Sequence, residues 1–343
     1  MTLLSRSHLL LLTLSLAGAL LCWNAGHKGL FLLDQSMIFD SAWRILQGQM
    51  PYRDFGMPFG PVSSLLQAAS FWLLGLHWDA MVFPATLLHA LSVPLVWATQ
   101  RRLFPEQPGL AAWSAALFAA LSFYSPIGTL WFETTGIFFY LLALYLLTSN
   151  RPVADFAAGA LLLVVFLSKQ NVALFYGPCL LTWILLRPAP SGTRLPALLR
   201  FASGGLALLL TLLLAASTTG TLPAAWHYLI EIPRQIAAAR TSAAGLPMGY
   251  PVLLNYVLAA LFLALLPCLA LQGLRHQWRP AVFHLIEIVA WALTALSTAN
   301  ELVIYSFGAG RLLSNTYALL SSATHREAAR PLWLRALTPT YIL

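Results

Sequence analysis

The chain has 343 residues, of which 59% are hydrophobic and 9% are charged, and its mean hydropathy is +0.75. Soluble domains have roughly 45–50% apolar and about 25% charged residues, so this composition excludes an ordinary soluble domain and indicates a polytopic membrane protein. The net charge of +8 does not indicate nucleic-acid binding, because Lys and Arg lie mostly in short loops between apolar segments. The three cysteines lie far apart in apolar segments, which argues against a disulfide framework or a thiolate metal site: Cys22, Cys179 and Cys268.

The first apolar segment, residues 9–26, follows Arg6 and His8 and has the appearance of a signal peptide. No small-x-small cleavage site follows it, and the residues before Cys22 fit a lipoprotein processing site poorly. We therefore expect an uncleaved first span with a cytoplasmic N-terminus.

Ten apolar segments approach the length of about 20 residues that a membrane-spanning helix needs. They are residues 9–26, 61–77, 80–99, 110–126, 134–149, 154–168, 171–187, 201–218, 251–273 and 281–299. If all ten cross, basic loops fall on both faces of the membrane. If residues 61–77 instead lie along or dip into the outer leaflet, one change of parity brings four basic loops to the inner face, as the positive-inside rule requires. These loops carry Arg101, Arg102, Arg151, Arg187, Arg194, Arg200, Arg275 and Arg279.

The sequence therefore predicts an all-α polytopic membrane protein with about nine transmembrane helices, plus interfacial helices in the first outer loop, residues 27–79. Within that loop, residues 34–47 have the apolar spacing of a helix. A further interfacial helix is predicted over residues 224–241, broken near Pro233.

Residues 34–61 concentrate ionisable groups, since the whole chain has only 11 acidic residues and three of them are Asp34, Asp40 and Asp54. Charged groups beside a bilayer are costly unless they serve a function. Asp34 follows the exit of the first span, where desolvation would raise its pKa toward the range of a general base. The alternative is that it only caps the helix that follows. Asp40 lies six residues on, and we expect it to be solvated or structural.

The turn that follows holds Tyr52, Arg53 and Asp54 between proline and glycine residues. Arg53 and Asp54 either point to water in an ordered turn, or Arg53 binds an anionic headgroup, because guanidinium matches phosphate oxygens. Glu133 is a carboxylate at the top of an otherwise uncharged helix pair. It is either functional or a favourable charge at a helix N-terminus.

Lys169 is one of two lysines in the chain, the other being Lys28. It lies between two apolar helices, so it either snorkels to the headgroups or binds a specific anion. With Gln170 beside it, a lipid phosphate is the expected ligand. Arg234 in the later outer loop is a weaker candidate of the same kind.

The order of these features resembles a known family. A first span leads to a loop that opens with Asp34, then an interfacial helix, then G-x-x-PYRDF-x-x-x-x-GP at residues 48–61 and an apolar helix that ends in Leu-Leu-Gly. Arg-Arg-Leu-Phe, an acidic turn and a Lys-Gln pair follow. Over roughly residues 5–190 the chain resembles the membrane glycosyltransferases of the GT-C superfamily. The nearest are bacterial members related to protein O-mannosyltransferases, the aminoarabinose transferase and the Rgt-type lipopolysaccharide transferases.

The resemblance implies a glycosyltransferase, hexosyl or pentosyl, that takes a sugar from a polyprenyl-phosphate carrier and inverts its configuration by single displacement. The acceptor is a glycan, a lipid or a protein. Asp34 matches the first-loop carboxylate that deprotonates or orients the acceptor hydroxyl, and Glu133 matches a second acidic position. Arg53 and Lys169, with Gln170, would stabilise the departing phosphate. Supporting roles fall to Tyr52, Asp54, Asp40 and Arg234.

The same resemblance gives the expected location, the inner membrane of a bacterium, with the site at the outer face. Membrane lipids are the expected surroundings, and no nucleic-acid partner is expected. No protein metal site and no cofactor are predicted, although carboxylates with a phosphate can recruit a divalent cation.

The chain also departs from the family pattern. Asp34 is followed by Gln35 and Ser36, whereas members have Asp or Glu and then Gly. Residues 1–320 form the predicted transmembrane domain and residues 321–343 a basic tail, which makes the chain shorter than most members. A truncated form, a minimal variant and an inactive relative all stay open.

Two other classes of function remain. The first is a transporter or flippase of lipid-linked saccharides, which should place polar groups deep in several spans. Here the middles of the spans are nearly free of charge apart from His284 and Glu287, which favours chemistry at one face. The second is a non-catalytic membrane scaffold.

Overall fold

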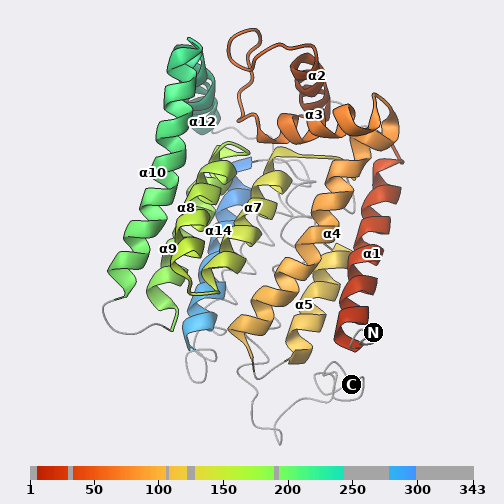
Figure 1. Ribbon diagram of the computed structural model, residues 1–343, viewed down its shortest axis with the longest axis vertical. Coiled ribbons are helices and arrows are strands. Elements are labelled where there is room, and N and C mark those ends of the chain that lie inside the picture. The colour runs from red at the N-terminus through yellow and green to blue at the C-terminus, as the bar shows by residue number, and fades with distance from the viewer. Residues whose placement is uncertain are drawn as a thin grey trace, which may run out of the picture.

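The computed structural model describes residues 6–29, 34–105, 108–121, 128–188, 193–242 and 278–298. Within these ranges the chain is helical apart from turns and one isolated bridge between Pro51 and Phe55, which confirms the predicted all-α class (Figure 1). The predicted segment 251–273 and the tail 321–343 lie outside the described residues.

The helices follow one another in this order: α1 (Arg6–Gly26), α2 (Asp34–Leu46), α3 (Val62–Leu74), α4 (Trp78–Leu103), α5 (Pro108–Leu121), α7 (Phe132–Leu147), α8 (Pro152–Phe166), α9 (Gln170–Leu186), α10 (Arg194–Thr218), α11 (Leu222–Trp226), the π-helical turn η1 (His227–Glu231), α12 (Ile232–Ser242) and α14 (Trp278–Thr298).

Three stretches of the described helices are long and apolar enough to cross a membrane: Ser7–Gly26, Trp78–Leu103 and Arg194–Thr218. Shorter apolar helices are α3, α7, α8 and α9, together with Gly109–Ala120 in α5. The chain is thus an integral membrane protein, as its composition predicts, while the number of nine spans stays a prediction.

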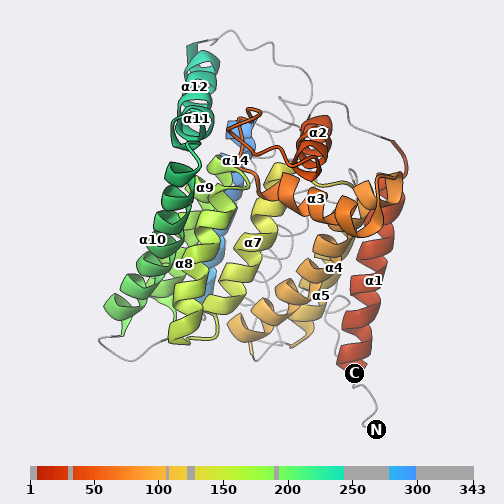
Figure 2. The ribbon, with the colours of Figure 1, turned by 45° about the horizontal axis from the view of Figure 1, so that its top comes forward.

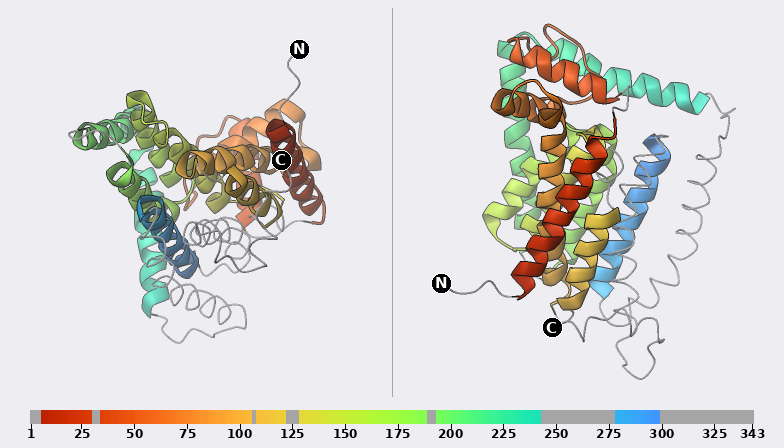
Figure 3. Two further views of the ribbon diagram at one scale, coloured as in Figure 1. Left: turned by 90° about the horizontal axis from the view of Figure 1, so that it is seen from below. Right: turned by 90° about the vertical axis from the view of Figure 1, so that its right-hand side faces the viewer.

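The long helices run side by side as a bundle, and α2, α3 and α12 lie across one end of it (Figures 2 and 3). We call this the capped end. Figure 3 shows the bundle from the opposite end and from the side, with α1 rising from the opposite end to the capped end. The orientation of α3 across the bundle fits the prediction that residues 61–77 do not continue the row of spans.

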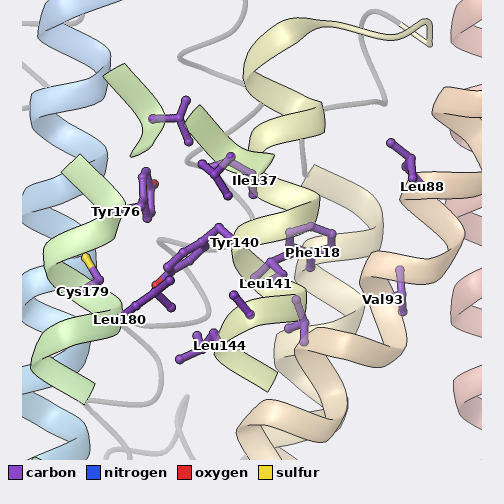
Figure 4. Packing of buried hydrophobic residues seen from close by; sticks show 14 of the residues in the cluster. Leu88, Val93, Phe118, Ile137, Tyr140, Leu141, Leu144, Tyr176, Cys179 and Leu180 are labelled. Atoms are coloured by element: carbon purple, nitrogen blue, oxygen red, sulfur yellow. The ribbon is translucent and has the colours of Figure 1, made fainter. Parts of the chain in front are cut away.

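The core of the bundle is built around α7. Its buried residues Tyr140, Leu141 and Leu144 face neighbours on α5 and α9, among them Phe118 and Leu180 (Figure 4). Such interdigitated apolar side chains supply the dispersion contacts that hold helices together.

The two ionisable residues predicted within the last span, His284 and Glu287, are both buried on α14. The Tyr140 hydroxyl donates to Glu287 Oε1 at 2.6 Å, and His284 Nδ1 lies 2.9 Å from Glu287 Oε2. This polar cluster joins α14 to α7.

Helices α8 and α10 approach each other closely through glycine. A Cβ added to Gly159 would lie 1.8 Å from the carbonyl oxygen of Phe201, and one added to Gly204 would lie 1.8 Å from that of Phe156. Small residues at such positions let helix backbones meet directly, as is common between membrane helices.

The break predicted near Pro233 is a π-helical turn instead. The chain continues from α11 through η1 into α12 without leaving the helical conformation. Proline has no N–H for the regular helical hydrogen bond, and a π turn directly before Pro233 accommodates that loss.

Candidate active site

At the capped end, the loop of residues 50–61 packs against the turn between α8 and α9. A Cβ on Gly60 would lie 1.8 Å from the carbonyl oxygen of Leu167, so only glycine allows this approach. The N–H of Val62 donates to that same oxygen at 3.4 Å. The Gly-Pro pair found in the sequence is therefore the point where the first outer loop contacts the α8–α9 turn.

Tyr52 folds the loop back on itself. Its φ of 66° lies in the left-handed region, its N–H donates to the Phe55 carbonyl at 2.8 Å, and its hydroxyl donates to the Phe59 carbonyl at 2.7 Å. Burial raises the pKa of Tyr52, so the phenol keeps its proton and its role as a donor. This side chain fixes the position of Phe59.

The central feature of the capped end is an ion pair between Glu133 and Lys169. Glu133 lies in the first turn of α7, Lys169 directly precedes α9, and Lys169 Nζ lies 3.1 Å from Glu133 Oε1. The Glu133 side chain is 3% exposed and that of Lys169 is 14% exposed. The second carboxylate oxygen, Oε2, is buried with no hydrogen-bond partner among the described residues.

Two aromatic rings enclose the ammonium group. Lys169 Nζ lies 3.7 Å from the ring centre of Phe59 and 5.7 Å from that of Phe132. The faces of these rings attract cations, and their bulk keeps water from the pair. Burying two charges costs free energy that one direct contact rarely recovers, and here Glu133 Oε2 also lacks a hydrogen-bond partner among the described residues. The pair is therefore a candidate for a functional role.

Gln170 connects the loop to the helices over the capped end. Its Nε2 donates to the carbonyls of Pro58 at 3.3 Å and Leu229 at 3.2 Å. Leu229 precedes Pro233 by four residues, and Pro233 has no N–H to donate to that carbonyl. The amide of Gln170 thus braces two backbone segments, and its phosphate-binding role stays a prediction.

The other predicted polar residues lie on the surface of the capped end. Arg53 donates to both oxygens of Asp54 at 2.9 and 2.8 Å, and Asp54 Oδ2 also accepts the Met50 N–H at 2.7 Å. Arg53 first, and then the Met50 N–H, lowers the pKa of Asp54 to about 2. Arg44 donates to Asp40 at 2.8 Å on the surface of α2, and Arg234 is exposed on α12.

A small cleft of about 190 Å³ separates α2 from the loop. Asp40, Ser41 and Arg44 line one side, and Phe55 and Met57 line the other. Phe132 also lines it, and the same ring lies beside Lys169. The Phe132 ring is therefore shared by the cleft and the surroundings of the buried ion pair.

Asp34 is the first residue of α2, and its side chain lies outside the described ones. The helix begins where the sequence predicts. Gln35 donates to the hydroxyl of Thr129, which lies four residues before Glu133. The start of α2 is thereby anchored beside the segment that leads into α7.

The structure brings Glu133, Lys169 and Gln170 together with the loop that carries Tyr52, and it keeps Arg53, Asp54 and Arg44 in separate surface pairs. Sequence reasoning missed Phe59 and Phe132, because only the fold brings these rings to Lys169. Within the described part of the chain, no three His, Cys, Asp or Glu side chains gather as a metal site would require.

Comparison with known proteins gives one match. Residues 58–217 match the family model described as dolichyl-phosphate-mannose-protein mannosyltransferase, whereas searches of curated proteins and of solved structures found nothing similar. The matched segment is a little under half of the chain and includes Phe59, Glu133, Lys169 and Gln170, but not α2. The match confirms the resemblance inferred from the sequence. Residues 58–217 are thus similar to the dolichyl-phosphate-mannose-protein mannosyltransferases, a family of membrane glycosyltransferases of the GT-C type.

Proposed function

We propose that this protein transfers a sugar from a polyprenyl-phosphate carrier to an acceptor at the capped end, and that this end faces away from the cytoplasm. The observation that carries the proposal is the buried pair of Glu133 and Lys169, in which one carboxylate oxygen has no hydrogen-bond partner among the described residues. It lies at the end of the bundle, within the segment that matches the glycosyltransferase family.

Charge supports the orientation. Described arginines on the opposite side of the bundle lie in the last turn of α4, between α7 and α8, directly after α9 and in the first two turns of α10: Arg101, Arg102, Arg151, Arg187, Arg194 and Arg200. Positive loops stay on the cytoplasmic side of a membrane. The capped end is then the outer end, in agreement with the predicted cytoplasmic N-terminus before α1, and a bacterial inner membrane is the proposed setting.

Lys169 is the group proposed to meet the carrier phosphate. At rest its charge is shared with Glu133 Oε1 at 3.1 Å. An arriving phosphodiester competes for the same ammonium, so it draws Lys169 outward, and Arg53 at the loop surface adds a second cation. As the bond between the sugar and the phosphate breaks, the phosphate oxygen takes the electron pair, and these cations stabilise its charge.

Asp34 is proposed as the base. The acceptor hydroxyl oxygen forms the new bond to the anomeric carbon, its proton passes to the Asp34 carboxylate, and the polyprenyl phosphate leaves. Asp34 opens α2, whose start Gln35 anchors close to the segment before α7. The family description names mannose as the sugar and protein as the acceptor, and both are the first choices for this chain.

The test is sugar transfer by the purified protein in lipid nanodiscs, with a panel of polyprenyl-phosphate sugars. The Asp34→Asn variant should retain its fold and lose about two orders of magnitude or more of the rate, as expected for the loss of a general base. Asp79→Asn is the matched control, because Asp79 is a 57% exposed carboxylate at the start of α4 that pairs with His27.

The rates of wild type and of Asp34→Asn distinguish the possible results. Equal rates for wild type and Asp34→Asn would place the base elsewhere. A wild-type protein that transfers no sugar from any donor in the panel, while it still binds the carriers, would contradict the enzyme and favour a scaffold.

A further inference from the structure

A second cleft, lined by both polar and apolar side chains, lies at the end of the bundle opposite the capped end. It occupies about 700 Å³ between the last turns of α4 and α7 and the first turn of α8. The lining residues that matter here are Arg102, Tyr145, Thr148, Arg151 and Val153, and none of the lining residues is acidic. None of them takes part in the proposed transfer reaction.

Arg102 is held rigidly in the wall of this cleft. Its Nη1 donates to the carbonyl of Tyr145 and to the hydroxyl of Thr148, both at 3.0 Å, and its Nη2 donates to the Tyr145 hydroxyl at 3.1 Å. The guanidinium also lies 4.2 Å from the centre of the Tyr145 ring. Because a guanidinium has five N–H donors, two remain for a ligand after these three bonds.

Arg151 contributes a second guanidinium beside the start of α8. It is exposed, directly precedes that helix and lines the cleft together with Val153. Pro152 at the first position of α8 has no N–H, but the next N–H groups, of Val153 and Ala154, have no partner within the helix and carry a partial positive charge. The nearby carboxylate of Asp155 does not oppose this charge, because it is buried and accepts hydrogen bonds from Arg187 at 2.7 Å and Arg200 at 3.0 Å.

Apolar side chains continue from the mouth of the cleft along the outside of α8. Val153 is 79% exposed and Phe156 is 42% exposed, although both are large and hydrophobic. A ligand with an anionic head and an apolar tail can therefore contact both the arginines and the apolar side chains, whereas a free anion can contact only the arginines. Basic pockets between membrane helices on the cytoplasmic side suit the headgroups of acidic lipids.

We infer that this cleft binds the phosphate group of an acidic phospholipid, with an acyl chain lying along Val153 and Phe156. The two guanidinium groups and the start of α8 bind the phosphate, and the exposed side chains of α8 select a lipid over a soluble phosphate. From the proposed function the inference takes only the orientation, with this end toward the cytoplasm. It does not depend on the transfer reaction, since it uses other residues at the other end of the molecule.

The experiment is lipid binding to the full chain in an uncharged detergent, counted by native mass spectrometry. The probes are dioleoyl phosphatidylglycerol, dioleoyl phosphatidylcholine and glycerol 1-phosphate. Wild type should bind phosphatidylglycerol more tightly than the other two. Arg151→Gln should weaken that binding roughly fivefold, the effect of about one basic residue near a lipid surface. Val153→Glu, which adds a carboxylate to the wall of the cleft, should weaken phosphatidylglycerol binding more than Arg151→Gln does.

Arg194→Gln is the matched control, because Arg194 is an exposed arginine at the start of α10 and does not line the cleft. It should bind phosphatidylglycerol as wild type does. An equal loss in both arginine variants would show general attraction to a basic surface and overturn the inference. Glycerol 1-phosphate bound as tightly as the lipid would overturn it as well, in favour of a site for soluble phosphate.

Discussion

At the scale of single residues, the Glu133–Lys169 pair combines two opposed demands. The charges are almost fully buried, so each depends on the other for compensation. The contact uses only one carboxylate oxygen and leaves Oε2 without a partner among the described residues. A pair serving stability alone would be expected to satisfy both oxygens, since an unsatisfied buried acceptor costs about 1–3 kcal/mol.

A pair of this kind predicts strong coupling between its members. Lys169→Met should lower the free energy of unfolding by about 3–5 kcal/mol, because it leaves a buried carboxylate uncompensated. The double variant Lys169→Met/Glu133→Gln removes both charges and should recover a large part of that loss. Thermal unfolding in detergent of wild type, Lys169→Met, Glu133→Gln and the double variant measures the four free energies of the cycle. Additive effects of the two substitutions would contradict the coupling.

At the scale of helices, sequence reasoning succeeded where the signal is local. The segments 34–47, 134–149 and 171–187 correspond to α2 (Asp34–Leu46), α7 (Phe132–Leu147) and α9 (Gln170–Leu186) within two residues at each end. Apolar length and periodicity set these bounds. The π turn before Pro233 was not predicted, because it depends on how α11 and α12 pack over the capped end.

Contacts between helices that are distant in sequence left no such signal. Nothing in the spacing of Phe59, Glu133 and Lys169 predicts that they meet, and the hydrogen bonds of Gln170 to two carbonyls are equally non-local. The sequence therefore predicted which polar residues share one end of the molecule, whereas their partners came from the fold alone.

The packing of α8 on α10 gives a prediction at this scale. Gly159→Ala should destabilise the protein by about 1–3 kcal/mol, because the new methyl group would lie 1.8 Å from the Phe201 carbonyl oxygen and push the helices apart. Gly177→Ala in α9 is the control, since its methyl group meets only the flexible Leu162 side chain at 3.4 Å. Thermal unfolding in detergent compares the two, and a Gly159→Ala protein as stable as the control would refute close packing here.

At the scale of the whole molecule, the two ends differ in chemistry. The capped end holds the loop, the transverse helices (Figure 1), the enclosed ion pair and two arginines paired with surface carboxylates. At the opposite end, Arg187 and Arg200 share the buried carboxylate of Asp155, and further arginines lie at the surface. The parity argument from basic loops predicts two such ends from the sequence, while the number of spans and the orientation stay predictions. It needed only the position of charges along the chain, which is why it could precede any knowledge of packing.

Labelling of introduced cysteines tests the orientation directly. Arg234→Cys, on α12 at the capped end, should react with a membrane-impermeant maleimide in intact cells. Arg194→Cys, at the start of α10, should react only after the cells are made permeable. The unsubstituted chain is the control for its own cysteines, of which Cys22 and Cys179 are buried. The reverse pattern would turn the capped end toward the cytoplasm.

The hydrogen bonds of Gln170 have a consequence for the order of events during turnover. Lys169 and Gln170 are adjacent, so the backbone segment that carries the ammonium group also ties Pro58 to Leu229. In the proposed reaction, a carrier that draws Lys169 outward would strain these two ties together and loosen the π-helical turn that holds Leu229. Release of the spent carrier would let the ties re-form, so that Gln170 would act as a latch whose state follows the occupancy of the site.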